Sequence, residues 1–235
     1  MTSPANDLFD RTRPVGEIAA ALPGATEVFR RFGLDFCCRG DIALEQSARQ
    51  RGVDVDEVER ALSELPVDAK PDAPSATGEL IDHIRTRYHE VHRRELAELV
   101  RLARKVEQVH AGHASVPRGL ADLLERMAQE LEQHMYKEEL ILFPAMASAM
   151  SGLEAPIARM RHEHDDHGQT LGALEALTRD FTVPTGACRT WEALYAGASK
   201  FADDLRQHIH LENNVLFPRF ASGDRSVQQP GKCWR

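Results

Sequence analysis

The sequence writes one eleven-residue pattern twice, as HMYKEELILFP at residues 134–144 and as HIHLENNVLFP at residues 208–218. Both copies read H-x-x-x-E, followed after two residues by an aliphatic residue and Leu-Phe-Pro. Residues four apart lie on the same face of a helix, so each copy directs an imidazole and a carboxylate toward one place. A single His/Glu pair of this spacing is also typical of a surface contact. Its repetition in two otherwise apolar stripes favours a metal site between two facing helices.

The chain around the two copies predicts an all-α protein whose larger part is an up-down-up-down four-helix bundle. Apolar residues recur at steps of three and four, as they do in helices that bury one face. Four long helices are expected, at about residues 79–111, 118–150, 154–180 and 187–221. Short connections make consecutive helices antiparallel neighbours. The proline of each Leu-Phe-Pro is expected to kink its helix or to end it early.

Residues 1–66 are expected to form a small domain of several short helices. Asp41 can cap one of these helices, and Asp54 begins a capping-box-like start for the last one. Cys37 and Cys38 lie between helices, in a stretch that is too short and too closely flanked by glycine to be helical. The domain therefore carries an adjacent pair of thiols in a loop.

The prolines and small residues of 67–78 predict a linker. We place the four-helix bundle at residues 79–225 and a C-terminal tail at residues 226–235. The small N-terminal domain has a thin core and is expected to pack on another surface. That surface is either its own bundle or the bundle of a second chain, so a homodimer is compatible with the sequence.

Charge and composition exclude several classes of protein. The net charge is −8 and no cluster of basic residues occurs, which argues against binding to nucleic acid or to an anionic membrane. No apolar run of about 18 residues is present, so neither a transmembrane helix nor a secretory signal is expected. A cytoplasmic location follows, in which the four cysteines are expected to be reduced thiols.

The apolar seams of the predicted bundle carry polar side chains beyond the two H-x-x-x-E pairs, which is costly unless they are paired or bind a metal. The third helix offers His164 and His167. In the first predicted helix, His83 and His92 lie at the edges of the apolar stripe, and His89 is expected to face away from that stripe. The layout of the repeat favours His83 and His164 as the missing partners, although periodicity alone leaves both choices open. The other histidines are expected to be solvated: His110, His113, His162 and His210.

Four imidazoles and two carboxylates suit a site for two metal ions. Two bridging glutamates and two histidines for each ion would give four protein donors to each, with room for an oxo or hydroxo bridge and a small ligand. Imidazole and carboxylate donors on a bundle favour two non-haem iron ions per chain over manganese or zinc. The open positions suit a small molecule such as O₂, NO or peroxide.

The sequence resembles the iron–sulfur cluster repair di-iron family, or RIC family, over nearly its whole length. Besides both copies of the repeat, the resemblance rests on Asp35-Phe36-Cys37-Cys38, Ile81-Asp82-His83-Ile84, Arg87-Tyr88-His89, Glu163-His164-Asp165 and Leu211-Glu212-Asn213-Asn214. It implies metal ligation, with both glutamates bridging, by His83, His134, Glu138, His164, His208 and Glu212. The chain departs from the family at Arg39, where a glycine usually follows the two cysteines.

The resemblance also implies a role in restoring iron–sulfur clusters damaged by nitric oxide or oxidants, with the damaged proteins as partners. The di-iron centre would donate iron, or would bind and reduce NO, in which case the protein would be an enzyme. Cys37 and Cys38 would accept iron, pass on NO or dock the client, unless they are merely small buried residues. Glu163 is a candidate for gating or proton transfer near the irons, unless it is an ordinary exposed acid.

Three rival functions follow from the same features. A hemerythrin-type O₂ or NO carrier or sensor would want a histidine at position 168 and an aspartate at position 213, where this chain has Gly168 and Asn213. Ferroxidase or iron-storage sites are richer in carboxylates and use E-x-x-H motifs. A DNA-binding regulator is disfavoured by the acidic charge.

Overall fold

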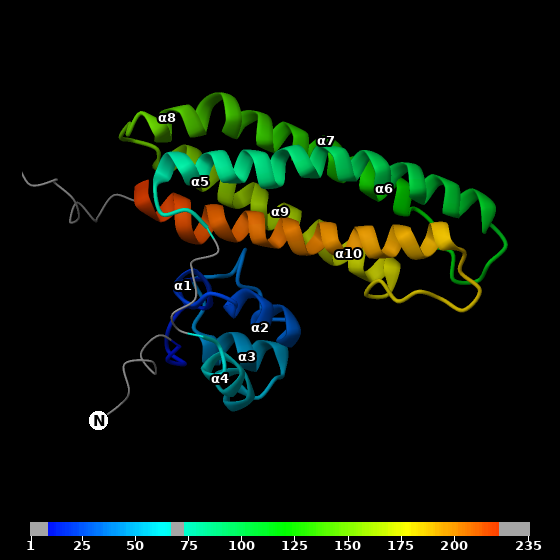
Figure 1. Cartoon of the computed structure of the whole chain (residues 1–235), viewed down its shortest axis with the longest axis horizontal. Helices are drawn as coiled ribbons and strands as arrows, with labels where there is room; N and C mark the ends of the chain where they lie inside the picture. The colour runs from blue at the N-terminus through cyan, green and yellow to red at the C-terminus, as the bar shows by residue number, and fades with distance from the viewer. Residues whose placement is uncertain (1–8, 67–72, 221–235) are drawn as a thin grey trace, which may run out of the picture.

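The computed structural model describes residues 9–66 and 73–220. Within these ranges the chain is helical, and the only β pairing is an isolated bridge between Pro14 and Ala43. The larger part is a bundle of four long rods that run alternately up and down (Figure 1), which confirms the predicted fold class. The predicted domain boundaries stay predictions, and the residues 67–72 of the linker and the whole tail 226–235 lie outside the described residues.

Three of the four rods change their helical winding along their length. The first consists of α5 (Thr77–Ile84), the π-helical turn η2 (Arg85–His89) and α6 (Glu90–Val109). The second consists of α7 (Leu120–Lys137), the π-helical η3 (Glu138–Leu142) and α8 (Phe143–Ala147). The third is the single helix α9 (Glu154–Thr178). The fourth consists of α10 (Arg189–His210), the π-helical η4 (Leu211–Leu216) and the 3₁₀ turn η5 (Phe217–Phe220).

The two Leu-Phe-Pro prolines behave differently. Pro144 lies in the first turn of α8, directly after η3, so the second rod continues through it. A proline is tolerated there because the wider π turn before it has already altered the hydrogen-bond ladder. Pro218 lies in the 3₁₀ turn with which the described part of the fourth rod ends.

The π turns shift which side chains face the core. Each adds residues to one turn, so the buried face advances by one position beyond a π stretch. A regular 3.6-residue period continued from His134/Glu138 and from His208/Glu212 would place Ile141 and Val215 on the apolar seams, but Ile141 is 67% exposed and Val215 is only half-buried. The next residue along, Leu142 or Leu216, is buried in each case. Periodicity of 3.6 residues was therefore the wrong period at these two places.

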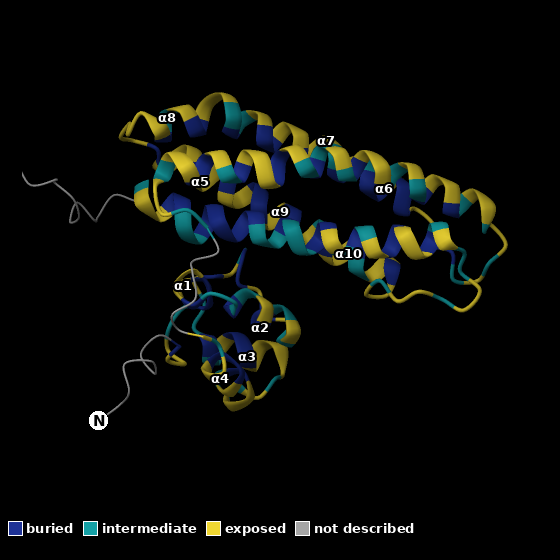
Figure 2. Cartoon of the chain, viewed as in Figure 1, coloured by how far each residue is buried: buried dark blue, intermediate teal, exposed yellow. Residues whose placement is uncertain are grey.

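The buried interior of the bundle is divided into three layers. One apolar cluster lies where α6, α7 and α10 pack together, and it extends into the N-terminal unit. A second cluster lies at the opposite end and includes Leu80, Leu142, Ile157 and Leu216. Between the two, every rod contributes buried polar residues, and Figure 2 shows buried residues at intervals along the rods. No helix in the described part of the chain is long and apolar enough to cross a membrane.

The N-terminal unit comprises four short helices, α1 (Val15–Ala21), α2 (Ala25–Phe32), α3 (Leu44–Arg51) and α4 (Val55–Ser63). The Asp54 carboxylate accepts a hydrogen bond from the Asp56 backbone N–H at 3.0 Å, which confirms the predicted cap of α4. The predicted cap at Asp41 is wrong, because α3 begins only at Leu44 after an extended Ala43.

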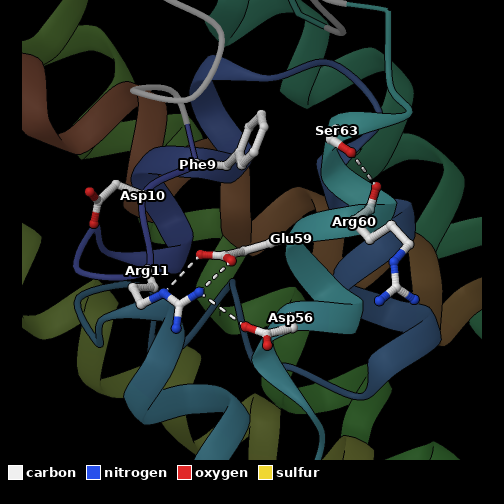
Figure 3. A pocket seen from close by; sticks show the side chains of 7 residues that line it. All are labelled: Phe9, Asp10, Arg11, Asp56, Glu59, Arg60 and Ser63. Carbon is white, nitrogen blue, oxygen red and sulfur yellow. Dashed lines mark hydrogen bonds and ion pairs between the residues drawn. The ribbon is translucent and has the colours of Figure 1, made fainter. Parts of the chain in front are cut away.

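Arg11 joins the segment before α1 to the last helix of this unit. Its guanidinium donates to Glu59 at 2.7 and 3.1 Å and to Asp56 at 3.0 Å (Figure 3). Exposed ion pairs of this kind add little stability each. The unit is held instead by its apolar core and by its contact with the bundle, where α1 lies against η4. The N-terminal unit therefore packs on the bundle of its own chain (Figure 1).

Candidate metal centre

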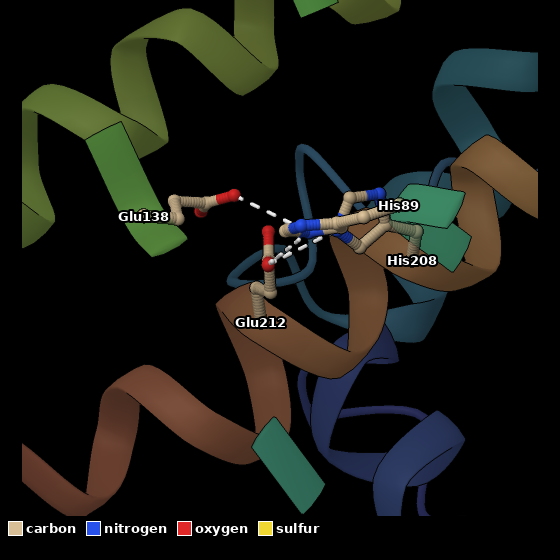
Figure 4. A group of neighbouring side chains, drawn as sticks. All are labelled: His89, Glu138, His208 and Glu212. Atoms are coloured by element: carbon tan, nitrogen blue, oxygen red, sulfur yellow. Dashed lines mark hydrogen bonds and ion pairs between the residues drawn. The ribbon is translucent and has the colours of Figure 1, made fainter. Parts of the chain in front are cut away.

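Two groups of buried donors occupy the polar layer of the bundle. The His89 group consists of His89, Glu138, His208 and Glu212 (Figure 4), and the His134 group consists of His134, Glu138, His164 and Glu212. Within each group the ligand atoms lie within 4.8 Å of one another. Both groups contain both glutamates, so the two groups could hold metal through shared carboxylates.

The orientation of the two carboxylates fits this sharing. Glu138 presents Oε1 to His134 Nε2 at 3.3 Å and Oε2 to His89 Nε2 at 3.5 Å. Glu212 presents Oε1 to His208 Nε2 at 3.0 Å and Oε2 to His164 Nε2 at 3.0 Å. Each glutamate thus directs one oxygen to each group, as a bridging carboxylate does.

The donors also leave polar atoms that a cation would satisfy. Within the described part of the chain neither oxygen of Glu138 accepts a hydrogen bond, although the residue is fully buried. A buried carboxylate without hydrogen bonds is costly, and a bound cation offsets that cost. The Nε2 atoms of His89 and His208 lie 3.1 Å apart, and those of His134 and His164 lie 3.0 Å apart. Two nitrogens about 2.1 Å from one ion are separated by roughly this distance. The residues therefore fit the metal.

Hydrogen bonds from outside the donor groups orient three of the four imidazoles. His134 Nδ1 lies 2.9 Å from Glu163 Oε2, and His89 Nδ1 lies 2.8 Å from Glu139 Oε1. His164 Nδ1 lies 2.8 Å from Asn213 Oδ1. An Nδ1–H that is donated in this way fixes the tautomer in which Nε2 is free to bind a metal.

Both outer carboxylates are themselves held by cations. Arg93 donates to both oxygens of Glu139, at 2.9 and 3.1 Å. Glu163 Oε1 accepts from Lys137 at 2.6 Å and from Arg159 at 2.8 Å. The hydrogen bond from His134, reinforced by these two cations, holds the pKa of Glu163 well below its usual range. Glu163 therefore stays ionised and accepts the hydrogen bond of His134 Nδ1.

The charge of the layer favours cations. Burial by itself lowers the pKa of His134, but Glu138, Glu163 and Glu212 outweigh burial and raise that pKa to about 10. Burial would raise the pKa of Glu212, yet the adjacent histidines, His208 foremost, hold it well below its usual value. Without a metal the layer thus binds protons, which metal binding would release.

The predicted ligand His83 does not join either donor group. It is half-buried at the end of α5, with its ring centroid 5.8 Å from that of Tyr88. Its place is taken by His89, which we expected to face away and which is fully buried. The reason is the π turn η2. Its extra residue rotates the chain so that His89 points to the apolar seam, where neighbouring residues would lie in an unbroken α-helix.

One signal in the sequence could have revealed this shift. The residues Leu80, Ile84, Tyr88, His92 and Leu96 are all buried, and every step between them is four residues. On an α-helix each step of four overshoots a full turn by about 40°, so four such steps cannot keep to one face. A series of buried residues that are all four positions apart therefore indicates a wider turn, such as a π turn, within that stretch of helix.

Three further histidines are buried near the donor groups. His92 lies beside His208, with ring centroids 5.3 Å apart, and His167 lies beside His134 at 5.1 Å. Burial lowers the pKa of His92 well below its usual value and that of His167 to about 3, so both rings are neutral. The prediction that His210 is solvated was wrong, because it is 2% exposed and packs edge-on against Phe36. His162 is exposed, as we expected.

The two N-terminal thiols lie next to the metal layer. Cys37 is buried, Cys38 is half-buried, and their Sγ atoms are 3.6 Å apart. Cys38 Sγ lies 3.4 Å from the carbonyl oxygen of His164. The amide of Asn213, whose oxygen accepts from His164, donates through Nδ2 to the Cys37 carbonyl at 2.9 Å. A single side chain thus joins the thiol loop to a predicted metal ligand.

The same loop shows why one glycine suffices after the cysteines. A Cβ at Gly40 would lie 2.6 Å from Asn214 Oδ1 and 2.9 Å from the Phe36 carbonyl oxygen, so this position cannot carry a side chain without displacing its neighbours. The Asn214 amide also donates to the Phe36 carbonyl at 2.9 Å. Arg39, where the chain departs from the family pattern, is exposed and tolerates a side chain.

Comparison with known proteins assigns both parts of the chain. Residues 80–220 match the family model of the Hemerythrin HHE cation binding domain, and residues 11–66 match a Domain of Unknown function (DUF542). The hemerythrin domain implies a di-iron site, and the two buried donor groups could hold the metal.

Relatives match along almost the full length of the chain. An iron-sulfur cluster repair protein YtfE of Dickeya chrysanthemi is 48% identical over 91% of this chain and 99% of its own. A second YtfE, of Edwardsiella ictaluri, is 48% identical over 91% of this chain and 98% of its own. A probable iron-sulfur cluster repair protein of Haemophilus influenzae is 43% identical over 87% and 95%. The chain therefore belongs to the family of these iron-sulfur cluster repair proteins, with a hemerythrin-like bundle as its larger part.

Proposed function

We propose that this protein is a cytoplasmic di-iron protein that repairs iron–sulfur clusters damaged by nitric oxide or oxidants. The observation that carries the proposal is the pair of buried donor groups that share Glu138 and Glu212, with two thiols held beside them by Asn213. The names of the relatives support the same role. The partners would be proteins with damaged clusters.

In this proposal two iron ions per chain are held by the two donor groups, with both glutamates as bridges. Iron bound there would supply either ferrous iron for a damaged cluster or redox chemistry toward NO. The protein's own residues set the conditions for both. His89, His134, His164 and His208 would present Nε2 to the ions, and outer hydrogen bonds keep the rings of three of them in place, those of His89, His134 and His164. Apolar clusters lie on either side of the layer along the bundle.

Glu163 is proposed as the residue that connects the metal layer with solvent. Its side chain lines a surface pocket of about 550 Å³ between α7 and α9, together with Lys137, Arg159 and His167. On its other side it accepts a hydrogen bond from His134 Nδ1. A proton or a cation that leaves the layer here would meet this ionised carboxylate first. The prediction that Glu163 serves in gating or proton transfer is consistent with this position.

An O₂-carrying function of the hemerythrin type is less well supported. At Gly168, where hemerythrin would have a second histidine, an added Cβ would lie 3.0 Å from Cys38 Sγ. At position 213, Asn213 bonds both His164 and the thiol loop, and an aspartate has no N–H to donate to the Cys37 carbonyl. Both positions serve the packing of the thiols, which O₂ carriage does not require.

The function is tested by incubating the reduced protein with an enzyme whose iron–sulfur cluster has been damaged by NO. We expect the activity of that enzyme to return faster than with equal amounts of free ferrous salt and thiol. Recovery no faster than this control would contradict the repair function. The double variant Cys37→Ala/Cys38→Ala should repair more slowly while retaining its iron, whereas Cys188→Ala, at the far end of the bundle, should repair normally.

A further inference from the structure

A large cleft opens between the N-terminal unit and the outer surface of α9 and α10. Its volume is about 1160 Å³, and its lining includes Asp35, Cys37, Cys38 and Gly168. The dinuclear layer described above does not use these side chains. The cleft is therefore lined by a carboxylate and two thiols, of which Cys37 is buried and Cys38 is half-buried.

The three side chains have the spacing of ligands to a single ion. One ligand atom from each of Asp35, Cys37 and Cys38 lies within 4.8 Å of the other two. The two Sγ atoms are 3.6 Å apart. Two thiolates at about 2.3 Å from one tetrahedral ion would be roughly 3.8 Å apart, so the thiol pair needs almost no movement to chelate.

The loop is held in this arrangement from within. Asp35 Oδ1 accepts hydrogen bonds from the backbone N–H groups of Cys37, Cys38 and Arg39, at 3.2, 2.9 and 3.4 Å. These bonds turn both thiols to the same side of the loop. In the described part of the chain Oδ2 of Asp35 has no hydrogen bond and is free to act as a ligand.

The bundle holds the same loop from outside. Asn213 and Asn214 donate to the carbonyl groups of Cys37 and Phe36 at 2.9 Å each. The absence of a side chain at Gly168 lets Cys38 lie against α9. A loop fixed from both sides is preorganised, which lowers the entropic cost of binding an ion.

We propose that Asp35, Cys37 and Cys38 form a third metal site, separate from the dinuclear layer, that binds one divalent cation of the kind that prefers thiolate ligands. On binding, the two thiols lose their protons to solvent and the ion gains two thiolates and one carboxylate oxygen. The remaining coordination positions face the cleft, where water or an external cysteine can occupy them. Naming ferrous iron as the natural occupant, on its way to a client, rests on the proposed repair function.

The third site is distinct from the dinuclear layer. Cys38 Sγ donates to the main-chain carbonyl of His164 at 3.4 Å, and not to its ring nitrogens. The Asn213 amide stands between the Cys37 carbonyl and the His164 ring. Neither thiol belongs to either of the two donor groups. An ion bound here would therefore be a neighbour of the dinuclear centre and not part of it.

Cobalt(II) titration of the iron-loaded full-length protein under anaerobic conditions tests the proposal, because Co²⁺ bound to thiolate absorbs in the near ultraviolet. We expect one Co²⁺ per chain, with thiolate-to-cobalt bands, while the iron content stays constant. The variant Cys37→Ser/Cys38→Ser should lose the bands, and Asp35→Asn should bind Co²⁺ about tenfold more weakly. The matched control Cys188→Ser, a half-buried thiol beside His110, should keep both bands and affinity.

A second measurement on the unmodified chain does not depend on how a variant folds. Co²⁺ or Zn²⁺ should protect Cys37 and Cys38 from alkylation by iodoacetamide, as mapped by mass spectrometry, and leave Cys188 reactive. Absent thiolate bands, bands that survive the double serine variant, or unprotected Cys37 and Cys38 would each overturn the proposal. Failure to repair clusters despite such Co²⁺ binding would contradict the repair function alone and leave the third site standing.

Discussion

The two donor groups share both glutamates, yet their surroundings differ. Each group carries stacked rings: Tyr88 on His208 and Phe143 on His89 in the His89 group, and Phe217 on His164 in the His134 group. The outer bonds differ, because Glu163 of the His134 group lines a surface pocket and Asn213 joins that group to the thiol loop. The His134 group is therefore linked to the N-terminal unit, whereas the outer carboxylate of the His89 group, Glu139, is held by Arg93 of the bundle.

This difference suggests that the two donor groups have different roles, although the site looks symmetric in the sequence. The two H-x-x-x-E copies supply equivalent ligands, but the residue after the second glutamate is Asn213 and the residue after the first is Glu139. Glu139 is fixed by Arg93 on its own half, whereas Asn213 binds a second part of the chain. We expect exchange of iron to begin at the His134 group.

The largest effect is expected from the shared carboxylates. Glu138→Ala and Glu212→Ala each remove one donor from both groups at once, so each should lose most of the two irons per chain. Iron analysis of the purified variants measures this. The control His162→Ala changes an exposed residue on α9 and should retain normal iron. Loss of only one of the two irons in Glu138→Ala would show that this carboxylate serves one group alone.

Replacement of a single histidine separates the two groups. His89→Ala should lose iron from the His89 group, because its Nε2 is one of only four donors there. His83→Ala should keep its iron, because His83 lies outside both groups. Iron content and the absorption spectrum of the two variants, compared side by side, check this. Loss of iron in His83→Ala with normal iron in His89→Ala would show that His83, and not His89, is the ligand.

Two adjacent asparagines allow the link to the thiol loop to be dissected. Asn213→Ala removes the outer hydrogen bond of His164 and the bond to the Cys37 carbonyl, so iron affinity should fall about 10–100-fold and the thiols should react faster with alkylating agents. Asn214→Ala removes the bonds to the Phe36 carbonyl and to His210 Nδ1, and neither partner belongs to a donor group, so it should raise thiol reactivity and leave iron affinity close to normal. Equal effects of both variants on iron affinity would contradict a direct role of Asn213 toward His164.

The smallest effect concerns the stability of the metal-free protein at alkaline pH. The pKa of His134 is raised to about 10, from about 6.5 in an unfolded chain, so its protonated form stabilises the fold. That contribution is fully present below about pH 6.5 and is lost as the pH rises toward 10, at no more than about 1.4 kcal/mol per pH unit.

Denaturant unfolding between pH 6.5 and 10 measures this loss. Glu163→Gln removes one of the carboxylates that raise the His134 pKa, so it should narrow the range of pH over which this stabilisation is lost. His134→Gln should abolish this part of the pH dependence. A wild-type profile identical to that of His134→Gln would show that His134 carries no proton in the metal-free fold.

The sequence predicted the four rods and most of the metal layer for a clear physical reason. Helical periodicity and the repeated H-x-x-x-E are local patterns, and they brought His134, Glu138, His164, His208 and Glu212 together as expected. Their metal ligation stays a prediction. The choice of His83 failed because a π turn shifts the face by one position, and the resemblance to the family carried the same misassignment.

The packing of the N-terminal unit could not be read from the sequence. It depends on contacts such as that of Asn213 with the Cys37 carbonyl, 176 residues away along the chain. The acceptor is a main-chain carbonyl, which every residue has, so no side-chain pattern marks it. The close approach at Gly40 and Gly168 is likewise visible only when both surfaces are in place. A homodimer stays a prediction.

Mössbauer spectroscopy of the iron-57-enriched protein as isolated tests the central claim, a dinuclear iron centre with shared carboxylates, most directly. We expect two iron ions per chain with the signature of a coupled pair, and the loss of that signature in Glu138→Ala. A single uncoupled iron, or recovery of zinc alone from cells grown with iron in excess, would contradict the di-iron centre.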